Sequence, residues 1–143
     1  MTRRLETGLV HGSCVTFGEA GILILGVGGS GKSSLALELL AIGAVLVADD
    51  QVEIYADATG PGACAPAVLQ GLIEARKVGL LKADFAARTI IRLVIDLEQD
   101  ETDRLPPRRR ICLGGQKVDL ILGRNTPNLA IAAKLYVVNG RRY

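Results

Sequence analysis

The segment Gly21–Leu40, GILILGVGGSGKSSLALELL, limits the folds open to this chain more than any other. An apolar run is followed by a glycine-rich turn, GVGGSGKS, and then by leucines spaced with the period of a helix. The turn matches G-x-x-x-x-G-K-[ST], a pattern that binds phosphate when it joins a strand to a helix. Its glycines let successive backbone N–H groups converge on one group of oxygens, and the helix N-terminus adds its dipole. We therefore predict a phosphate-binding loop in this context.

Each part of the turn has a predicted role. Lys32 supplies a mobile positive charge for the terminal phosphates, and Ser33 offers its hydroxyl to Mg²⁺. A glycine-rich turn with a stray lysine is the alternative, and the flanking strand and helix patterns argue against it. The residues expected to hold a nucleotide's phosphates are Gly26, Val27, Gly28, Gly29, Ser30, Gly31, Lys32, Ser33 and Ser34.

Two acidic residues end the next apolar stretch, AVLVADD. They are Asp49 and Asp50, 17 and 18 residues after Lys32. Because successive strand residues point to opposite sides, one carboxylate could hold Mg²⁺, directly or through water, while the other acts as general base toward an incoming hydroxyl. Two solvated acids at a turn are the alternative. On the residues alone, Glu74 resembles a surface glutamate and His11 a packed histidine.

Composition excludes several classes of protein. A chain of 143 residues is of single-domain size. A net charge of +2 and 3% aromatic residues argue against a nucleic-acid partner. No apolar stretch approaches the roughly 20 residues of a membrane-spanning helix, and the N-terminus lacks the apolar region of a signal peptide. We therefore expect a soluble cytoplasmic protein whose three cysteines are reduced and mostly buried.

The remaining patterns predict one α/β or α+β domain. The first two expected strands are separated by a short glycine-bounded turn, which favours a hairpin. Expected strands span residues 9–17, 22–25, 44–50, 51–56, 89–98 and 111–123, expected helices 32–43 and 128–138, a short helix or turn 66–71, and loops 60–66 and 99–110.

Four blocks of sequence occur in an order typical of one bacterial family. VHG, GVGGSGKSSLALELL, LVADDQVEIY and LQGLIEARKVG follow one another at compatible spacing, and the likeness continues through IDLE, DRL and GRN. In these blocks the chain resembles the catalytic domain of HPr kinase/phosphorylase, which phosphorylates a serine of the phosphocarrier protein HPr. The resemblance implies a P-loop fold of the phosphoenolpyruvate-carboxykinase type with a mixed, β-rich core. Residues 1–143 would then form a single P-loop kinase catalytic domain.

The resemblance also implies cofactors, partners and residue roles. ATP and Mg²⁺ would be the cofactors, HPr the partner, and pyrophosphate and inorganic phosphate further substrates; the family assembles into hexamers. Asp50 would accept the serine proton in the forward reaction and act as acid in the reverse one. Arg104, and a second segment that contains Arg124, would serve dephosphorylation. The residues implied as catalytic are His11, Lys32, Asp50 and Arg104, and those implied at the metal are Ser33, Asp49 and Glu74.

Three features depart from the family pattern. The long forms of the family carry a separate N-terminal domain, and from the length of 143 residues we expect none here. In this respect the chain resembles the short forms of some α-proteobacteria, where HPr belongs to a regulatory phosphorelay. Arg76-Lys77 stands where the family has Arg-Gly, which adds a side chain. The loop between Gly79 and Thr89 is shortened and reads KADFAAR in place of a glycine-rich segment. We expect this region to alter the surface that docks HPr.

Two other functions remain open at this point. A nucleotide-sensing regulatory module would bind HPr or a two-component protein without phosphotransfer, and a small-metabolite kinase would phosphorylate a small molecule. Every chemical residue of the family pattern is present, which argues against an inactive sensor. A GTPase is excluded because the chain lacks the guanine-reading motif N-K-x-D.

Overall fold

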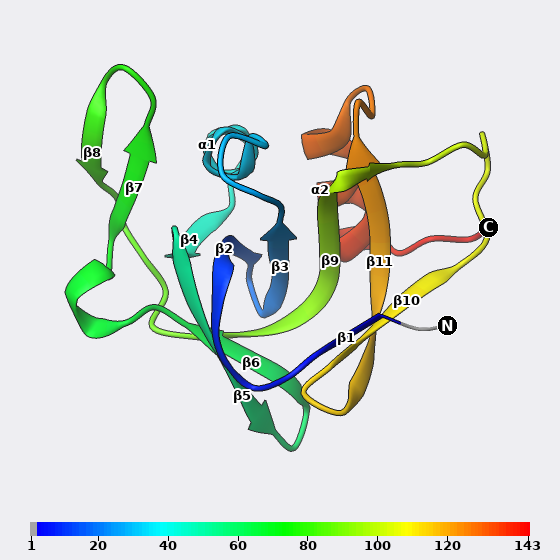
Figure 1. Ribbon diagram of the computed structural model, residues 1–143, viewed down its shortest axis with the longest axis horizontal. Helices are drawn as coiled ribbons and strands as arrows, with labels where there is room; N and C mark the ends of the chain where they lie inside the picture. The colour runs from blue at the N-terminus through cyan, green and yellow to red at the C-terminus, as the bar shows by residue number, and fades with distance from the viewer. Residues whose placement is uncertain (1–2) are drawn as a thin grey trace.

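The computed structural model describes residues 3–143, so residues 1 and 2 of the predicted domain lie outside it. Within this range, strands dominate and the α-helices number two (Figure 1). In chain order the elements are β1 (Arg3–Leu5), β2 (Gly8–Phe17), β3 (Ala20–Leu25), α1 (Lys32–Ala41), β4 (Val45–Ala48), β5 (Gln51–Asp57), β6 (Gly60–Cys64), the 3-10 turn η1 (Ala67–Leu69), β7 (Leu72–Ala75), β8 (Gly79–Lys82), β9 (Thr89–Asp100), β10 (Arg109–Leu113), β11 (Gln116–Arg124) and α2 (Leu129–Asn139).

The strands before the glycine-rich loop form the predicted antiparallel hairpin β2–β3. β3 also pairs in parallel with β9, far along the chain. The main sheet runs β1-β10-β11-β9-β3-β2-β5-β6, with β4 beside β2, and it contains both parallel and antiparallel pairs. Because β6 also pairs with β9, the strands β9, β3, β2, β5 and β6 close into a ring. The expected mixed, β-rich α/β core is confirmed.

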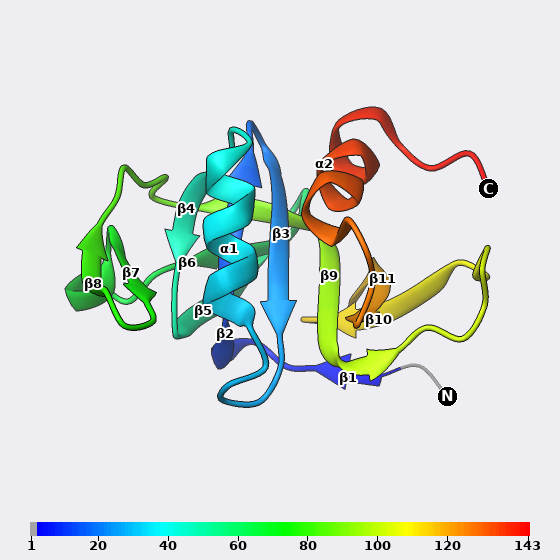
Figure 2. The same ribbon diagram turned by 90° about the horizontal axis from the view of Figure 1, so that it is seen from above.

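Alternation along β3 divides the core into two layers. Leu23 and Leu25 belong to a cluster with side chains of β5, β6 and β10. Ile22 and Ile24 point the other way and pack with residues of α1 and α2. This is the period-two pattern of a strand that is buried on both faces. Figure 2 shows both helices on the same side of β3 and β9, so β3 is fixed from both faces directly before the loop.

Both predicted α-helices form. α1 starts at Lys32, immediately after Gly31, whose φ of 98° lies in the left-handed region that favours glycine. α1 buries Leu35 and Leu39 against the sheet. α2 buries only Ala130 and Ala133 and leaves larger apolar side chains exposed. Neither helix in residues 3–143 is long and apolar enough to cross a membrane.

The loop predicted at residues 60–66 is wrong, because residues Gly60–Cys64 form β6 between β5 and the start of β9. The glycine at position 62 lets the Tyr55 ring approach the backbone, since a Cβ there would lie 2.3 Å from two ring carbons. The loop predicted at 99–110 is shorter, because β9 extends to Asp100 and β10 begins at Arg109. Local sequence did not predict β1 or the β7–β8 hairpin.

The prediction about the cysteines is only partly correct. All three cysteines are free thiols. Cys14 is buried, whereas Cys64 and Cys112 are only partly buried. Burial raises the pKa of the Cys14 thiol far above its usual range, so this group behaves as a small apolar core residue.

Candidate active site

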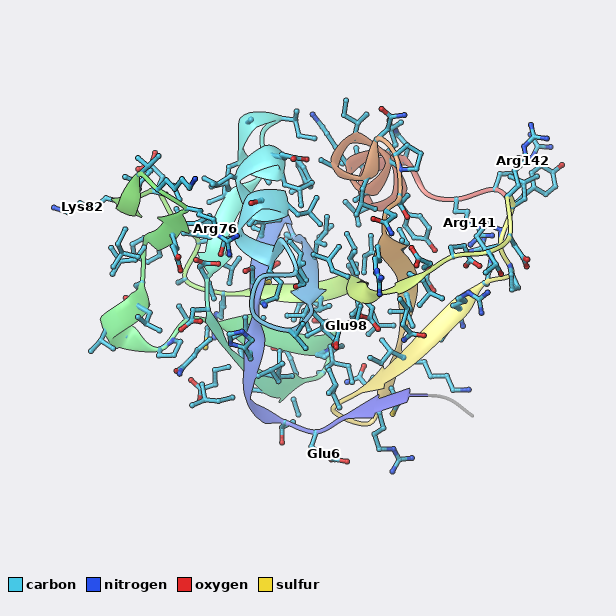
Figure 3. All side chains as sticks on the ribbon, turned by 45° about the horizontal axis from the view of Figure 1, so that its top comes forward. Glu6, Arg76, Lys82, Glu98, Arg141 and Arg142 are labelled. Carbon is cyan, nitrogen blue, oxygen red and sulfur yellow. The ribbon has the colours of Figure 1, made fainter. Side chains whose placement is uncertain are left out.

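The loop between β3 and α1 forms the floor of a pocket, which we call the phosphate pocket. Two side chains of β2 and residues of the β4–β5 turn and of β7 with its following turn surround the loop. Figure 3 shows Arg76 between the β7–β8 hairpin and α1. The lining residues are His11, Ser13, Gly28, Gly29, Gly31, Lys32, Ser33, Ser34, Asp50, Glu74 and Arg76.

Lys32 is folded back onto the loop. Its side chain is buried, and its Nζ donates hydrogen bonds to the carbonyl oxygens of Gly26 and Val27 at 2.8 and 3.0 Å. The Ser30 amide donates to the Val27 carbonyl at 3.0 Å and closes the turn. The ammonium group therefore lies within the loop, ready to exchange carbonyl oxygens for the oxygens of an anion.

Asp49 connects three segments of the pocket. Its Oδ1 accepts hydrogen bonds from Ser13 Oγ at 2.7 Å and Ser33 Oγ at 2.8 Å, and its Oδ2 accepts one from the backbone N–H of Glu74 at 3.0 Å. Asp49 is only 4% exposed. Since the Ser33 hydroxyl donates its hydrogen to Asp49, the lone pairs of Ser33 Oγ stay available for a cation.

Asp50 is the open counterpart of Asp49. Its side chain is 63% exposed, and its Oδ1 lies 3.6 Å from Nδ1 of His11. The backbone φ is 70°, a left-handed conformation, and the Asp50 carbonyl accepts a hydrogen bond from the Gly12 amide at 3.1 Å. The two neighbouring carboxylates take different directions, as predicted, but the physical reason differs: β4 ends at Ala48, so the left-handed backbone of Asp50 rather than strand alternation separates them. Asp49 is buried and Asp50 lines the pocket.

Two of the three residues predicted at the metal, Ser33 and Glu74, fit Mg²⁺ in chemistry. Ser33 and Glu74 supply hard oxygen ligands at the pocket wall, whereas both oxygens of Asp49 already accept hydrogen bonds. Within residues 3–143 no group of three or more His, Cys, Asp or Glu side chains could hold a metal by itself. This donor set is typical of Mg²⁺ sites in which phosphate oxygens and water complete the shell.

The structure does not bring Arg104 and Arg124 into the phosphate pocket of the same chain. They line a separate cavity, and Arg104 is exposed on the loop between β9 and β10. Nε of Arg124 lies 3.8 Å from Oδ2 of Asp100. Their predicted part in dephosphorylation therefore has no support from contacts within one chain.

Sequence reasoning missed Ser13 and Arg76. Ser13 follows His11 by two residues on one strand, and this spacing is the signal that could have placed both on the same face.

Lys77 adopts a φ of 67°. A left-handed backbone at this position explains why the family pattern has glycine there.

A family model for the HPr Serine kinase C-terminal domain matches residues 4–134. The chain belongs to this family. HPr kinase/phosphorylase of Bordetella pertussis is 41% identical over 113 residues, which cover 70% of this chain and 36% of that protein. HPr kinase/phosphorylase of an Acidovorax species is 36% identical over 144 residues, covering 87% of this chain and 45% of that protein. The chain thus spans less than half the length of these curated relatives.

A solved structure supports the fold. The Hpr(Ser) kinase/phosphatase from Coxiella burnetii matches with a TM-score of 0.76 and 22% sequence identity, over 92% of this chain and 88% of that chain. The fold class expected from the sequence is thereby confirmed.

Proposed function

We propose that this domain is an ATP-dependent, Mg²⁺-requiring kinase that phosphorylates a serine of the phosphocarrier protein HPr. The observation that carries the proposal is the convergence of Asp50 and the phosphate-binding loop on one pocket. Membership in the HPr serine kinase family supports the choice of HPr as acceptor. The relatives that share this part of the chain are named HPr kinase/phosphorylase.

The loop and Lys32 would hold the phosphates. The backbone N–H groups of the loop bind the phosphate oxygens, and Lys32 moves from its two carbonyl partners to the terminal phosphates, where it stabilises the charge that develops during transfer. Ser33 and Glu74 would hold Mg²⁺, with Asp49 orienting the Ser33 hydroxyl. Mg²⁺ bound there supplies positive charge beside the terminal phosphates.

Asp50 would act as the general base. Its exposed carboxylate accepts the proton of the HPr serine as the serine oxygen bonds to the terminal phosphorus and the bond to the leaving diphosphate breaks. His11, 3.6 Å away, is placed to orient this carboxylate. Dephosphorylation would be a phosphorolysis: an oxygen of inorganic phosphate bonds to the phosphorus on serine, the bond from that phosphorus to the serine oxygen breaks, Asp50 returns a proton to the serine oxygen, and pyrophosphate is released.

Replacing Asp50 with asparagine tests the assignment. Asn tolerates the left-handed backbone, so Asp50→Asn should keep the fold and nucleotide binding while phosphotransfer falls by at least about 100-fold. Transfer is measured with radiolabelled ATP and purified HPr. Asp57→Asn is the matched control: Asp57 is half-buried and outside the pocket, and asparagine keeps the side-chain oxygen that accepts hydrogen bonds from Thr59, so this variant should keep full activity. Unchanged transfer by Asp50→Asn would refute the base assignment.

The same assay separates the competing functions. A sensor binds ATP but leaves no label on HPr, and a metabolite kinase labels a small molecule instead. Adding inorganic phosphate to phospho-HPr tests the dephosphorylation, because phosphorolysis releases pyrophosphate. Sedimentation of the domain tests whether it forms the hexamer expected from the family.

A further inference from the structure

A second pocket opens on the other side of the phosphate-binding loop. The first turns of α1 and the start of α2 form its walls, and Leu97 at the end of β9 contributes to it. In Figure 1, α1 stands between the β7–β8 hairpin on one side and α2 on the other, so the two pockets flank the start of α1. The lining residues are Ser30, Gly31, Ser34, Leu35, Glu38, Leu97, Thr126, Asn128, Leu129, Ala130 and Ile131.

The two pockets are adjacent. Gly31 and Ser34 line both of them. The general base proposed above, Asp50, lies only in the phosphate pocket, so the terminal phosphoryl group must face that end. A triphosphate is a linear chain, so a donor with its terminal phosphoryl group beside Asp50 can extend over Gly31 and Ser34 toward the second pocket.

The second pocket has the chemistry of a site for a flat, partly polar group. Apolar side chains from both helices, among them Leu35 and Ile131, provide surfaces for packing. Asn128 adds an amide that does not cap α2. Glu38 and Thr126 add two further polar side chains to the wall. Apolar walls with a few convergent polar groups are typical of small-molecule sites.

We propose that the second pocket binds the nucleoside of the donor nucleotide, with the base packed between α1 and α2. Ile131 contacts the base, and the Asn128 amide hydrogen-bonds to the nucleoside. This inference rests on the proposed use of a nucleoside triphosphate as phosphoryl donor. It assigns donor selection to residues that lie outside the phosphate-binding loop.

The test compares ATP with tripolyphosphate, which has the phosphate chain but no nucleoside. Binding of each to the full chain is measured by calorimetry with Mg²⁺. Ile131→Gln and Asn128→Gly should each weaken ATP binding about tenfold, the low end for a lost contact in such a pocket. Tripolyphosphate binding should stay unchanged, which also shows that the variants are folded. Asn128 has a φ of 56°, so glycine preserves its backbone.

Leu135→Gln is the matched control. Leu135 lies one turn further along α2 and is 54% exposed, against 56% for Ile131, but it does not line the pocket. This variant should bind both ligands as the wild type does. Equal effects of Ile131→Gln and Leu135→Gln on ATP binding, or equal weakening of ATP and tripolyphosphate, would overturn the proposal. An Ile131-dependent preference for ATP without any phosphoserine on HPr would support the pocket and refute the kinase.

Discussion

Replacing Asp50 with glycine should raise stability while abolishing phosphotransfer. The φ of Asp50 is 70°, and a left-handed backbone costs a residue with a Cβ about 1–2 kcal/mol. Glycine avoids this cost but loses about 0.5–1 kcal/mol more conformational entropy on folding. The net gain in the free energy of unfolding is about 0–1.5 kcal/mol, which raises Tm by up to about 6 °C for a domain of this size. The exposed pair with His11 offsets little of it.

Scanning calorimetry and the phosphotransfer assay measure the two effects separately. Lys77→Gly is the control, because Lys77 has a φ of 67° and does not line the phosphate pocket. It should give a similar rise in Tm and retain activity. If Lys77→Gly raises Tm and Asp50→Gly lowers it, the strain argument fails for Asp50. If Asp50→Gly still phosphorylates HPr, Asp50 is not the base.

Two further predictions concern the frame of the fold. Arg109 donates two hydrogen bonds to Glu101, at 2.7 and 2.9 Å. Hydrogen bonding by the Arg109 side chain does most to lower the pKa of Glu101 to about 2. Because the pKa of Glu101 is lower in the folded state, its carboxylate stabilises the fold fully above the unfolded pKa, and this contribution is lost as pH falls toward 2. Arg109→Gln should therefore flatten this part of the acid-unfolding curve, followed by circular dichroism. Gly62→Ala should destabilise by about 1–3 kcal/mol in urea unfolding, because the new Cβ overlaps the Tyr55 ring; an unchanged midpoint would contradict this packing.

Features that depend on local sequence could be predicted. The β2–β3 hairpin, the loop and α1 follow from an apolar run, a glycine pattern and a helical repeat, which act over a few residues. β6 could not be predicted, because glycines such as Gly62 are typical of turns. In this strand the missing side chain of Gly62 instead allows the Tyr55 ring to approach the backbone. β1 has three residues and pairs with β10, more than 100 residues away, so no local pattern marks it.

The site divides in the same way. The loop and the two aspartates were found from their spacing. The family resemblance added His11 and Glu74, because residue type alone does not distinguish a functional histidine or glutamate from a packed or surface one. Ser13 was missed because its function depends on Asp49, 36 residues away in sequence. The second pocket was also missed, since α1 and α2 meet only in the folded chain.

The parallel pairing of β3 with β9 determines when this domain can be completed during synthesis. Ala20 pairs beside Ile90, and Leu25 beside Asp96, so one edge of β3 has no native neighbour until about 70 further residues have emerged. At roughly 5–20 residues per second, the ribosome needs about 4–14 s to supply them. For that interval the backbone groups on this edge of β3 lack their native partner. The order of the strands therefore leaves β3 open to pairing with another chain, or to binding by a chaperone, until β9 has been made.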